Sequence, residues 1–223
     1  AGLSARSVVW RGPAAETILD YADQVSVDQI VMATHGYSGI KHWTHGSVAE
    51  RVLQAARMPL LLVRVGEQDP ASDWQQAARC RRILVPLDGS PVAEQILPSV
   101  VSVAQAMSGE LILFQVPIAH VSGWMTGEWY LPIQGVLETA DADAEAYLST
   151  TAGRLEGQGV KATTATAIGS VANCIVEYAA VNNIDLIAMC THGRTGLARW
   201  ALGSVADRVL RAGGKPILLV RAQ

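Results

Sequence analysis

The chain carries one long segment twice, and this duplication limits what it can fold into. Residues 2–66 align with residues 159–223 without a gap, and 28 of the 65 aligned pairs are identical. In each copy an apolar run ends in Thr-His-Gly, nine residues follow, and the sequence then reads Gly-Ser-Val-Ala. Self-similarity of this length indicates two related structural units rather than one domain of 223 residues.

The repeated motif predicts a strand, a long loop and a helix. The apolar run is too short for a helix and breaks at a glycine, and a segment with helical period starts at Gly-Ser. A loop that leaves the carboxyl end of a strand in an α/β sheet and enters a helix is where ligands bind, and the N–H groups at the helix start favour an anion. We expect Gly203 to admit a phosphate close to the backbone and Ser204 to cap the helix. A plain loop with a helix cap is the alternative.

Strands and helices alternate along residues 82–223. The expected strands are residues 83–85, 111–116, 160–168, 185–190 and 216–221. The expected helices are residues 90–107, 137–156, 170–181 and 203–212. This alternation predicts an α/β fold with a doubly wound, five-stranded parallel sheet and right-handed crossovers.

The first copy is expected to be partial. Its predicted strands are residues 7–10, 28–34 and 60–65, and its predicted helices are residues 13–24 and 46–56. This is only the second half of the pattern found in residues 82–223. We therefore expect the C-terminal half of a first domain in residues 1–66, a linker in residues 67–81 and a complete domain in residues 82–223.

The repeated motif resembles the glycine-rich nucleotide loop of the universal stress protein family. The family pattern is Gly, two residues, Gly, nine residues, Gly and then Ser or Thr. Both copies keep the second and third of these glycines, as Gly36, Gly46, Gly193 and Gly203. Another small residue replaces the first glycine, Ala33 in one copy and Cys190 in the other. The resemblance covers all of the second unit and the loop half of the first.

The resemblance implies a flavodoxin-like, HUP-type sheet with strand order 3-2-1-4-5, in which the first and fourth strands are neighbours. Asp88 and the loop from Gly193 to Ser204 would then face each other across one crevice. By similarity to nucleotide-binding members of the family, ATP or a related adenine nucleotide, with or without Mg, would contact Pro86, Asp88, Val116, Met189, Gly193, Gly203, Ser204 and Val205. The Asp88 carboxylate suits ribose hydroxyls, although it could instead hold a turn or a helix start.

The first copy retains part of the same site. Gly36, Gly46 and Ser47 stand at the matching loop positions, so this copy is predicted to hold a vestigial site. No partner corresponding to Asp88 precedes Asp28. We therefore expect any nucleotide in the first copy to be weakly held.

Three functions remain open from the sequence. The residues favour an adenine-nucleotide-binding stress-response or signalling module, and the competitors are a slow ATP hydrolase and a dimeric scaffold that binds no nucleotide. No Walker lysine follows a glycine-rich turn, which disfavours an enzyme. His35 and His192 could act in acid–base chemistry or fix the loop by hydrogen bonds, and the second role is favoured.

Composition excludes several other classes. A net charge of −3 without a basic stripe argues against nucleic-acid binding, and apolar runs of five to seven residues are far too short to cross a membrane. The three cysteines form neither a CxxC pair nor a metal-binding pattern, which fits a reduced cytoplasmic protein. Cys190 is interpreted as a buried small hydrophobe, with a reactive thiol as the alternative.

Two further segments leave alternatives open. The long stretch of residues 117–135 is rich in aromatic side chains, which could cover a protein surface or close over a ligand. The acidic helix expected at residues 137–156 is interpreted as a solvated face rather than a metal site.

The final strand of each copy is strongly apolar and follows a proline. In the order 3-2-1-4-5 these strands lie at sheet edges, and an exposed apolar edge must be paired or covered. We therefore expect residues 60–65 to pack against residues 217–221, either within one chain or between chains of a homodimer. The resemblance points the same way, because universal stress proteins commonly dimerise through this strand.

Overall fold

The computed structural model of the chain describes residues 4–33, 47–63, 80–117, 133–192, 202–212 and 214–222, with side chains of residues 133–138 excepted. Most of the predicted linker, most of the aromatic stretch of residues 117–135, and Gly36, Gly46 and Gly193 lie outside these ranges. The predicted domain boundaries therefore stay a prediction.

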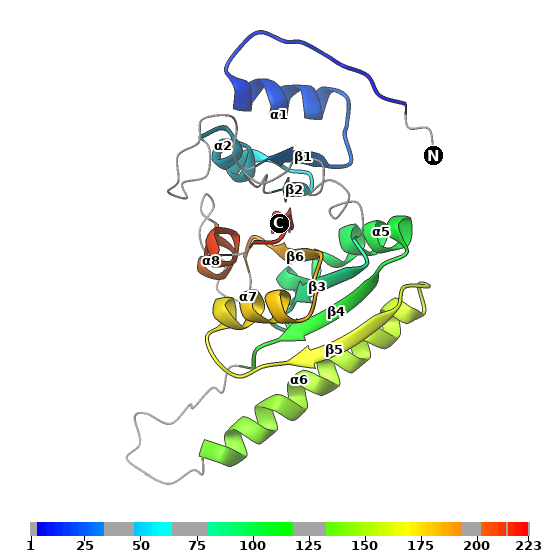
Figure 1. Cartoon of the computed structure of the whole chain (residues 1–223), viewed down its shortest axis with the longest axis vertical. Helices are drawn as coiled ribbons and strands as arrows, with labels where there is room; N and C mark the ends of the chain where they lie inside the picture. The colour runs from blue at the N-terminus through cyan, green and yellow to red at the C-terminus, as the bar shows by residue number, and fades with distance from the viewer. Residues whose placement is uncertain are drawn as a thin grey trace.

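Both copies contribute to one seven-stranded sheet with the order β1-β2-β7-β6-β3-β4-β5, which runs from β1, below α1 in the upper part of Figure 1, to β5 in the lower part. The strands are β1 (Ile30–Ala33), β2 (Leu60–Val63), β3 (Arg82–Pro86), β4 (Glu110–Gln115), β5 (Ala162–Thr166), β6 (Leu186–Cys190) and β7 (Ile217–Val220). Neighbouring strands are parallel except β2 and β7. Within residues 82–223 the observed order confirms the predicted order 3-2-1-4-5.

Helices cover the sheet because successive side chains of each strand face opposite sides. One apolar cluster joins the sheet to α1 (Ala14–Gln24), α2 (Ser47–Ala55), α7 (Val171–Val181) and α8 (Ser204–Ala212). The cluster on the other face involves α4 (Pro91–Glu94), α5 (Leu97–Met107) and α6 (Ile133–Glu156). In β3, Leu84 faces the first cluster while Ile83 and Val85 face the second, which explains its unbroken apolar sequence.

The contact between β3 and β6 has a polar clamp at its N-terminal end. The Asp185 carboxylate accepts hydrogen bonds from the N–H groups of Arg81 (2.9 Å) and Arg82 (3.0 Å), and the Asp185 N–H donates to the Arg82 carbonyl (2.9 Å). These bonds set the register in which Ile83 lies beside Leu186. The carboxyl ends of the two strands consequently meet at the same edge of the sheet.

The two copies join through their final strands, as the sequence predicted. β2 and β7 pair antiparallel, with Leu60 opposite Leu219, Leu61 opposite Leu218 and Leu62 opposite Ile217. Because residues 60–63 are the equivalents of residues 217–220, this contact relates the copies by a local pseudo-twofold axis. A homodimer through the same strands stays a prediction.

Residues 7–10 do not form the predicted strand. The equivalent strand of the second copy is β5, which pairs with β4, and no equivalent of β4 stands beside residues 7–10 in the described part of the chain. Trp10 packs edge-on against Tyr21 of α1, with ring centroids 5.5 Å apart. In the second copy the equivalent Tyr178 meets Phe114 of β4 at 4.9 Å. Trp10 thus contacts Tyr21, whereas a β4 side chain contacts the equivalent tyrosine of the second copy.

The single helix predicted for residues 90–107 is two helices, α4 and α5. Pro98 explains the break, because proline has no N–H to donate to the carbonyl four residues earlier and its ring crowds that carbonyl. Ser90 caps α4 as predicted, since its hydroxyl accepts a hydrogen bond from the Ala93 N–H. α6 begins at Ile133, ahead of its predicted start. No helix in the described ranges has both the length and the apolarity to cross a membrane.

We predict that a charge at the β2–β7 contact destabilises the chain. Leu62 is 2% exposed and Val31 of β1 is 61% exposed. Leu62→Lys should therefore lower the free energy of unfolding by at least about 3 kcal/mol, while Val31→Lys should change it by less than about 0.5 kcal/mol. Denaturant titration compares the two variants. Equal stabilities would show that β2 is not buried against β7.

Candidate functional site

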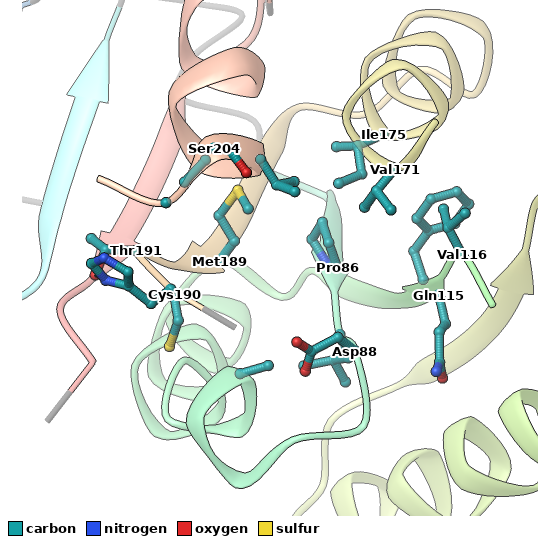
Figure 2. Close-up of a pocket in the computed structure, with 17 residues that line it drawn as sticks. Pro86, Asp88, Gln115, Val116, Val171, Ile175, Met189, Cys190, Thr191 and Ser204 are labelled. Atoms are coloured by element: carbon teal, nitrogen blue, oxygen red, sulfur yellow. The ribbon is translucent and has the colours of Figure 1, made fainter. Parts of the chain in front are cut away.

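A cavity of about 200 Å³ lies at the carboxyl ends of β3, β4 and β6 and at the starts of α7 and α8. Seven of the eight residues predicted to bind nucleotide line it: Pro86, Asp88, Val116, Met189, Gly203, Ser204 and Val205. The eighth, Gly193, is outside the described residues. Figure 2 shows Asp88 on one side of this space, with Met189 and Ser204 across from it and Val171, Ile175 and Val116 on a third side.

One part of the cavity is apolar. Its walls are Pro86, Phe114, Val116, Val171, Ile175 and Met189. Such a surface accepts a flat apolar group, and the polar groups beside it would fix its orientation. The sequence prediction missed Val171 and Ile175, which lie one turn apart at the start of α7. Their spacing and the position of α7 directly after β5 are the signals that point to them.

Gln115 lines the cavity, but its side chain points away from the apolar walls (Figure 2). Its neighbours Phe114 and Val116 belong to the cluster on the α7 face, and alternation along β4 turns Gln115 to the opposite face. In Figure 2 the Gln115 amide accordingly points away from Val171 and Ile175. Its carbonyl oxygen is buried and has no hydrogen-bond partner among the described residues.

Asp88 stands at the cavity and also holds a turn, so the two roles considered for it coexist. Its Oδ1 accepts hydrogen bonds from the Ser90 N–H (2.9 Å) and the Ser90 hydroxyl (2.6 Å). The carboxylate is therefore tied to the start of α4. Among the described residues that line the cavity, Asp88 is the one carboxylate.

The start of α8 supplies hydrogen-bond donors to the opposite side. The Asp207 N–H donates to the Gly203 carbonyl (2.9 Å), so Gly203 takes the capping position and Ser204 is the first helical residue. The prediction that Ser204 caps α8 was wrong for this reason. The N–H groups of Ser204, Val205 and Ala206 have no carbonyl partner within the helix, and the helix dipole adds positive potential there.

Gly203 has a steric role that the sequence did not predict. A Cβ at this position would lie 2.7 Å from the Thr191 carbonyl oxygen, because the two backbones meet there. The Gly203 N–H already donates to that same oxygen at 2.8 Å and is not offered to a ligand. A side chain at position 203 would thus disturb the backbone at the end of β6.

We therefore predict that Gly203→Ala destabilises the fold. Accommodating the extra methyl group should cost about 1 to 3 kcal/mol in the free energy of unfolding. Gly153 in α6 is the control, because a Cβ there would meet nothing within 4 Å and Gly153→Ala should stabilise the helix by up to about 1 kcal/mol. Chemical unfolding of both variants checks this, and an unchanged stability of Gly203→Ala would refute the steric explanation.

His192 and Thr191 connect the end of β6 to the end of the chain. The Thr191 hydroxyl lies 3.1 Å from His192 Nδ1 and accepts a hydrogen bond from the Ala222 N–H at 3.3 Å. The predicted role of His192 in fixing the loop stays a prediction, because residues 193–201 lie outside the described ranges. His192 Nε2 is buried, and no hydrogen-bond partner for it lies in the described part of the chain.

Cys190 has the character of a buried small hydrophobe. The residue is 5% exposed. The pKa of its thiol is raised to about 12, mainly because burial disfavours the thiolate. A backbone hydrogen bond with Ile96 lowers this pKa and the charge of Asp88 raises it, and both effects are smaller than that of burial. At neutral pH the thiol is therefore protonated and a poor nucleophile. A reactive thiol is not favoured at this position.

The raised pKa of Cys190 predicts a loss of stability at alkaline pH. The folded state disfavours the thiolate, so this contribution is complete below the ordinary pKa of 9.0 and is lost as the pH rises towards about 12. Between pH 8 and pH 10 the free energy of unfolding of the wild type should fall by about 1 kcal/mol more than that of Cys190→Ala. Alanine is chosen because Ala33 stands at the equivalent position of the first copy.

Urea unfolding at several pH values measures this difference in slope. If Cys190→Ala and the wild type lost the same stability over this range, the proposed environment of the thiol would be incorrect.

Comparison with known proteins agrees with the fold. The model of the universal stress protein family matches residues 1–64 and 79–221. The chain belongs to the universal stress protein family.

Individual relatives support this assignment. Universal stress protein MJ0531 of Methanocaldococcus jannaschii is 32% identical over 145 residues, which cover 63% of this chain and 82% of that protein. A universal stress protein of Mycolicibacterium smegmatis is 24% identical over 225 residues, which cover 99% of this chain and 70% of that protein.

A solved structure shows the same fold. The crystal structure of a universal stress protein from Archaeoglobus fulgidus superimposes with a TM-score of 0.68 at 21% identity, covering 93% of this chain and 66% of that one. The chain thus spans about two thirds of the length of these relatives that match nearly all of it.

Proposed function

We propose that this chain binds an adenine nucleotide, ATP or a close relative, in the cavity at the carboxyl ends of β3, β4 and β6. The supporting observation is that residues from four distant segments, 86–88, 116, 189 and 203–205, line one cavity. Membership of the universal stress protein family supports a role in stress response or signalling. A cytoplasmic location belongs to the same proposal.

The base, the ribose and the phosphates each have a part of the cavity whose side chains or N–H groups suit them. The base lies between the apolar side chains of β3, β4 and α7, and the ribose hydroxyls donate to the Asp88 carboxylate. The phosphates lie at the start of α8, where unpaired N–H groups and the helix dipole favour negative charge. The donors, the carboxylate and the apolar walls are on different sides of the cavity, which fixes one orientation for the nucleotide.

A Mg²⁺ ion would enter this site with the nucleotide. The described residues contain no group of three or more His, Cys, Asp or Glu side chains that could hold a metal by themselves. Mg²⁺ commonly keeps several waters and is bound by substrate phosphates with one or two carboxylates. An ion held by waters and by the phosphates at the start of α8 fits that mode of binding, and Asp88 stays with the ribose.

The competing functions have less support. For slow ATP hydrolysis a base must activate water, and Asp88 is already engaged with Ser90 at the start of α4. The scaffold alternative is favoured by one observation, the direct pairing of the two copies through β2 and β7. That pairing leaves the cavity open, so binding and assembly are compatible.

The two copies provide a matched test of phosphate binding. Ser204 and Ser47 are equivalent, and both are exposed first residues of a helix. Ser204→Asp places a negative charge where the phosphates are proposed to lie, while the helix dipole tolerates that charge. We expect ATP to bind Ser204→Asp at least about tenfold more weakly and adenosine to be little affected, since adenosine has no phosphate.

Titration calorimetry measures both affinity and stoichiometry. The wild type and Ser47→Asp should each bind one ATP per chain with the same affinity, because the first copy has no counterpart of Asp88. Two equal sites per chain would contradict the predicted asymmetry. Absence of ATP binding would favour the scaffold, and equal ATP affinity of Ser204→Asp and Ser47→Asp would remove α8 from the site.

A further inference from the structure

We infer that Ser90 positions the Asp88 carboxylate for recognition of the ribose hydroxyls. This inference rests on the proposed nucleotide site and assigns to that site a residue beyond those that line the cavity. Ser90 is 8% exposed and is not among the described residues in contact with the cavity. Ser90 is thus a positioning residue rather than a ligand of the nucleotide.

The geometry around Ser90 links the cavity to a helix cap. The Ser90 hydroxyl donates to Asp88 Oδ1 at 2.6 Å, and the Ser90 N–H donates to the same oxygen at 2.9 Å. The hydroxyl oxygen also accepts the Ala93 N–H at 3.1 Å, as the cap of α4. The Ser90 hydroxyl therefore uses its proton for Asp88 and its oxygen for the α4 cap at the same time. A rotation of either side chain would break one of these bonds.

Two donors on one oxygen fix the plane of the carboxylate. An ionised carboxylate can accept about four hydrogen bonds, so the two from Ser90 orient the group without exhausting its capacity. Hydrogen bonds to a charged acceptor are short and strong, and the bond between the two side chains has the corresponding length. Asp88 is therefore preorganised, and ribose binding does not have to order it.

A separate contact at the other end of α4 supplies the control. Glu94, the last residue of α4, accepts hydrogen bonds from the Tyr147 hydroxyl (3.0 Å) and from Arg154 (2.7 Å), both on α6. These bonds hold α4 without contacting Asp88. Glu94→Ala therefore loosens α4 while it leaves the Ser90–Asp88 bonds in place.

The decisive variant is Ser90→Gly. Glycine is accepted at a helix cap with little loss of stability, so this variant removes the hydroxyl but retains the helix. Ser90→Thr keeps a hydroxyl that can make both bonds. We would measure the affinities of the full chain for ATP, 2′-deoxy-ATP and 3′-deoxy-ATP by titration calorimetry and compare the ratios, because a general loosening of α4 changes the affinities but not their ratio.

The wild type should prefer ATP over at least one deoxy analogue by about tenfold, as expected for a hydroxyl that donates to a charged acceptor. Ser90→Gly should reduce this preference to about twofold or less, whereas Ser90→Thr and Glu94→Ala should keep it. An unchanged preference in Ser90→Gly, or an equal loss in Glu94→Ala, would overturn the inference while ATP binding stands.

Two outcomes concern the wild type itself. If ATP bound with no preference over either deoxy analogue, Asp88 would not recognise the ribose hydroxyls. That result would overturn the inference and leave the proposed function in place. A wild-type chain that binds neither ATP nor its analogues would overturn the proposed function and the inference with it.

Discussion

The parallel contact between β3 and β6 determines where this protein can bind a ligand. The two strands are distant in sequence, and the Asp185 carboxylate joins them by accepting the N–H groups of Arg81 and Arg82. Once that register is set, Asp88 and the end of β6 emerge at the same edge of the sheet, beside the start of α8. Ligands of doubly wound sheets bind at such a switch point because the flanking loops separate there. The walls supplied by β3, β6 and the start of α8 depend on this pairing, and β4 is placed by its own parallel pairing with β3.

Duplication gives the two copies different roles in one sheet. Equivalent strands β2 and β7 pair antiparallel, and a single apolar cluster extends through α1 and α2 of the first copy and α7 and α8 of the second. Burial of both apolar edges avoids the association to which an exposed edge is prone. The described residues that line the cavity all belong to the second copy, and Trp10 contacts Tyr21 where the second copy has a residue of β4. In the described part of the chain, the first copy contributes packing to the shared sheet.

The alternation of apolar strands and helices was sufficient for the fold class, and the family resemblance supplied the strand order that the sheet shows. Sequence prediction failed where the outcome depends on a partner or on a backbone contact. Residues 7–10 have strand character but no neighbour to pair with, and Pro98 divides a helix whose apolar pattern is continuous. The role of Gly203 was also missed, since its approach to the Thr191 carbonyl exists only in three dimensions. Val171 and Ile175 line the cavity because of the path of α7, and their one-turn spacing is the only trace of this in the sequence.

The central claim is that nucleotide phosphates lie at the start of α8 and not at the equivalent start of α2. An NMR titration of the ¹⁵N-labelled chain with ATP tests it directly through the backbone amide signals of Ser204, Val205 and Ala206. We predict that these signals shift and saturate at one ATP per chain, while those of Ser47, Val48 and Ala49 stay in place. Equal shifts at both helices, or no shift at Ser204 to Ala206 under saturating ATP, would contradict the claim.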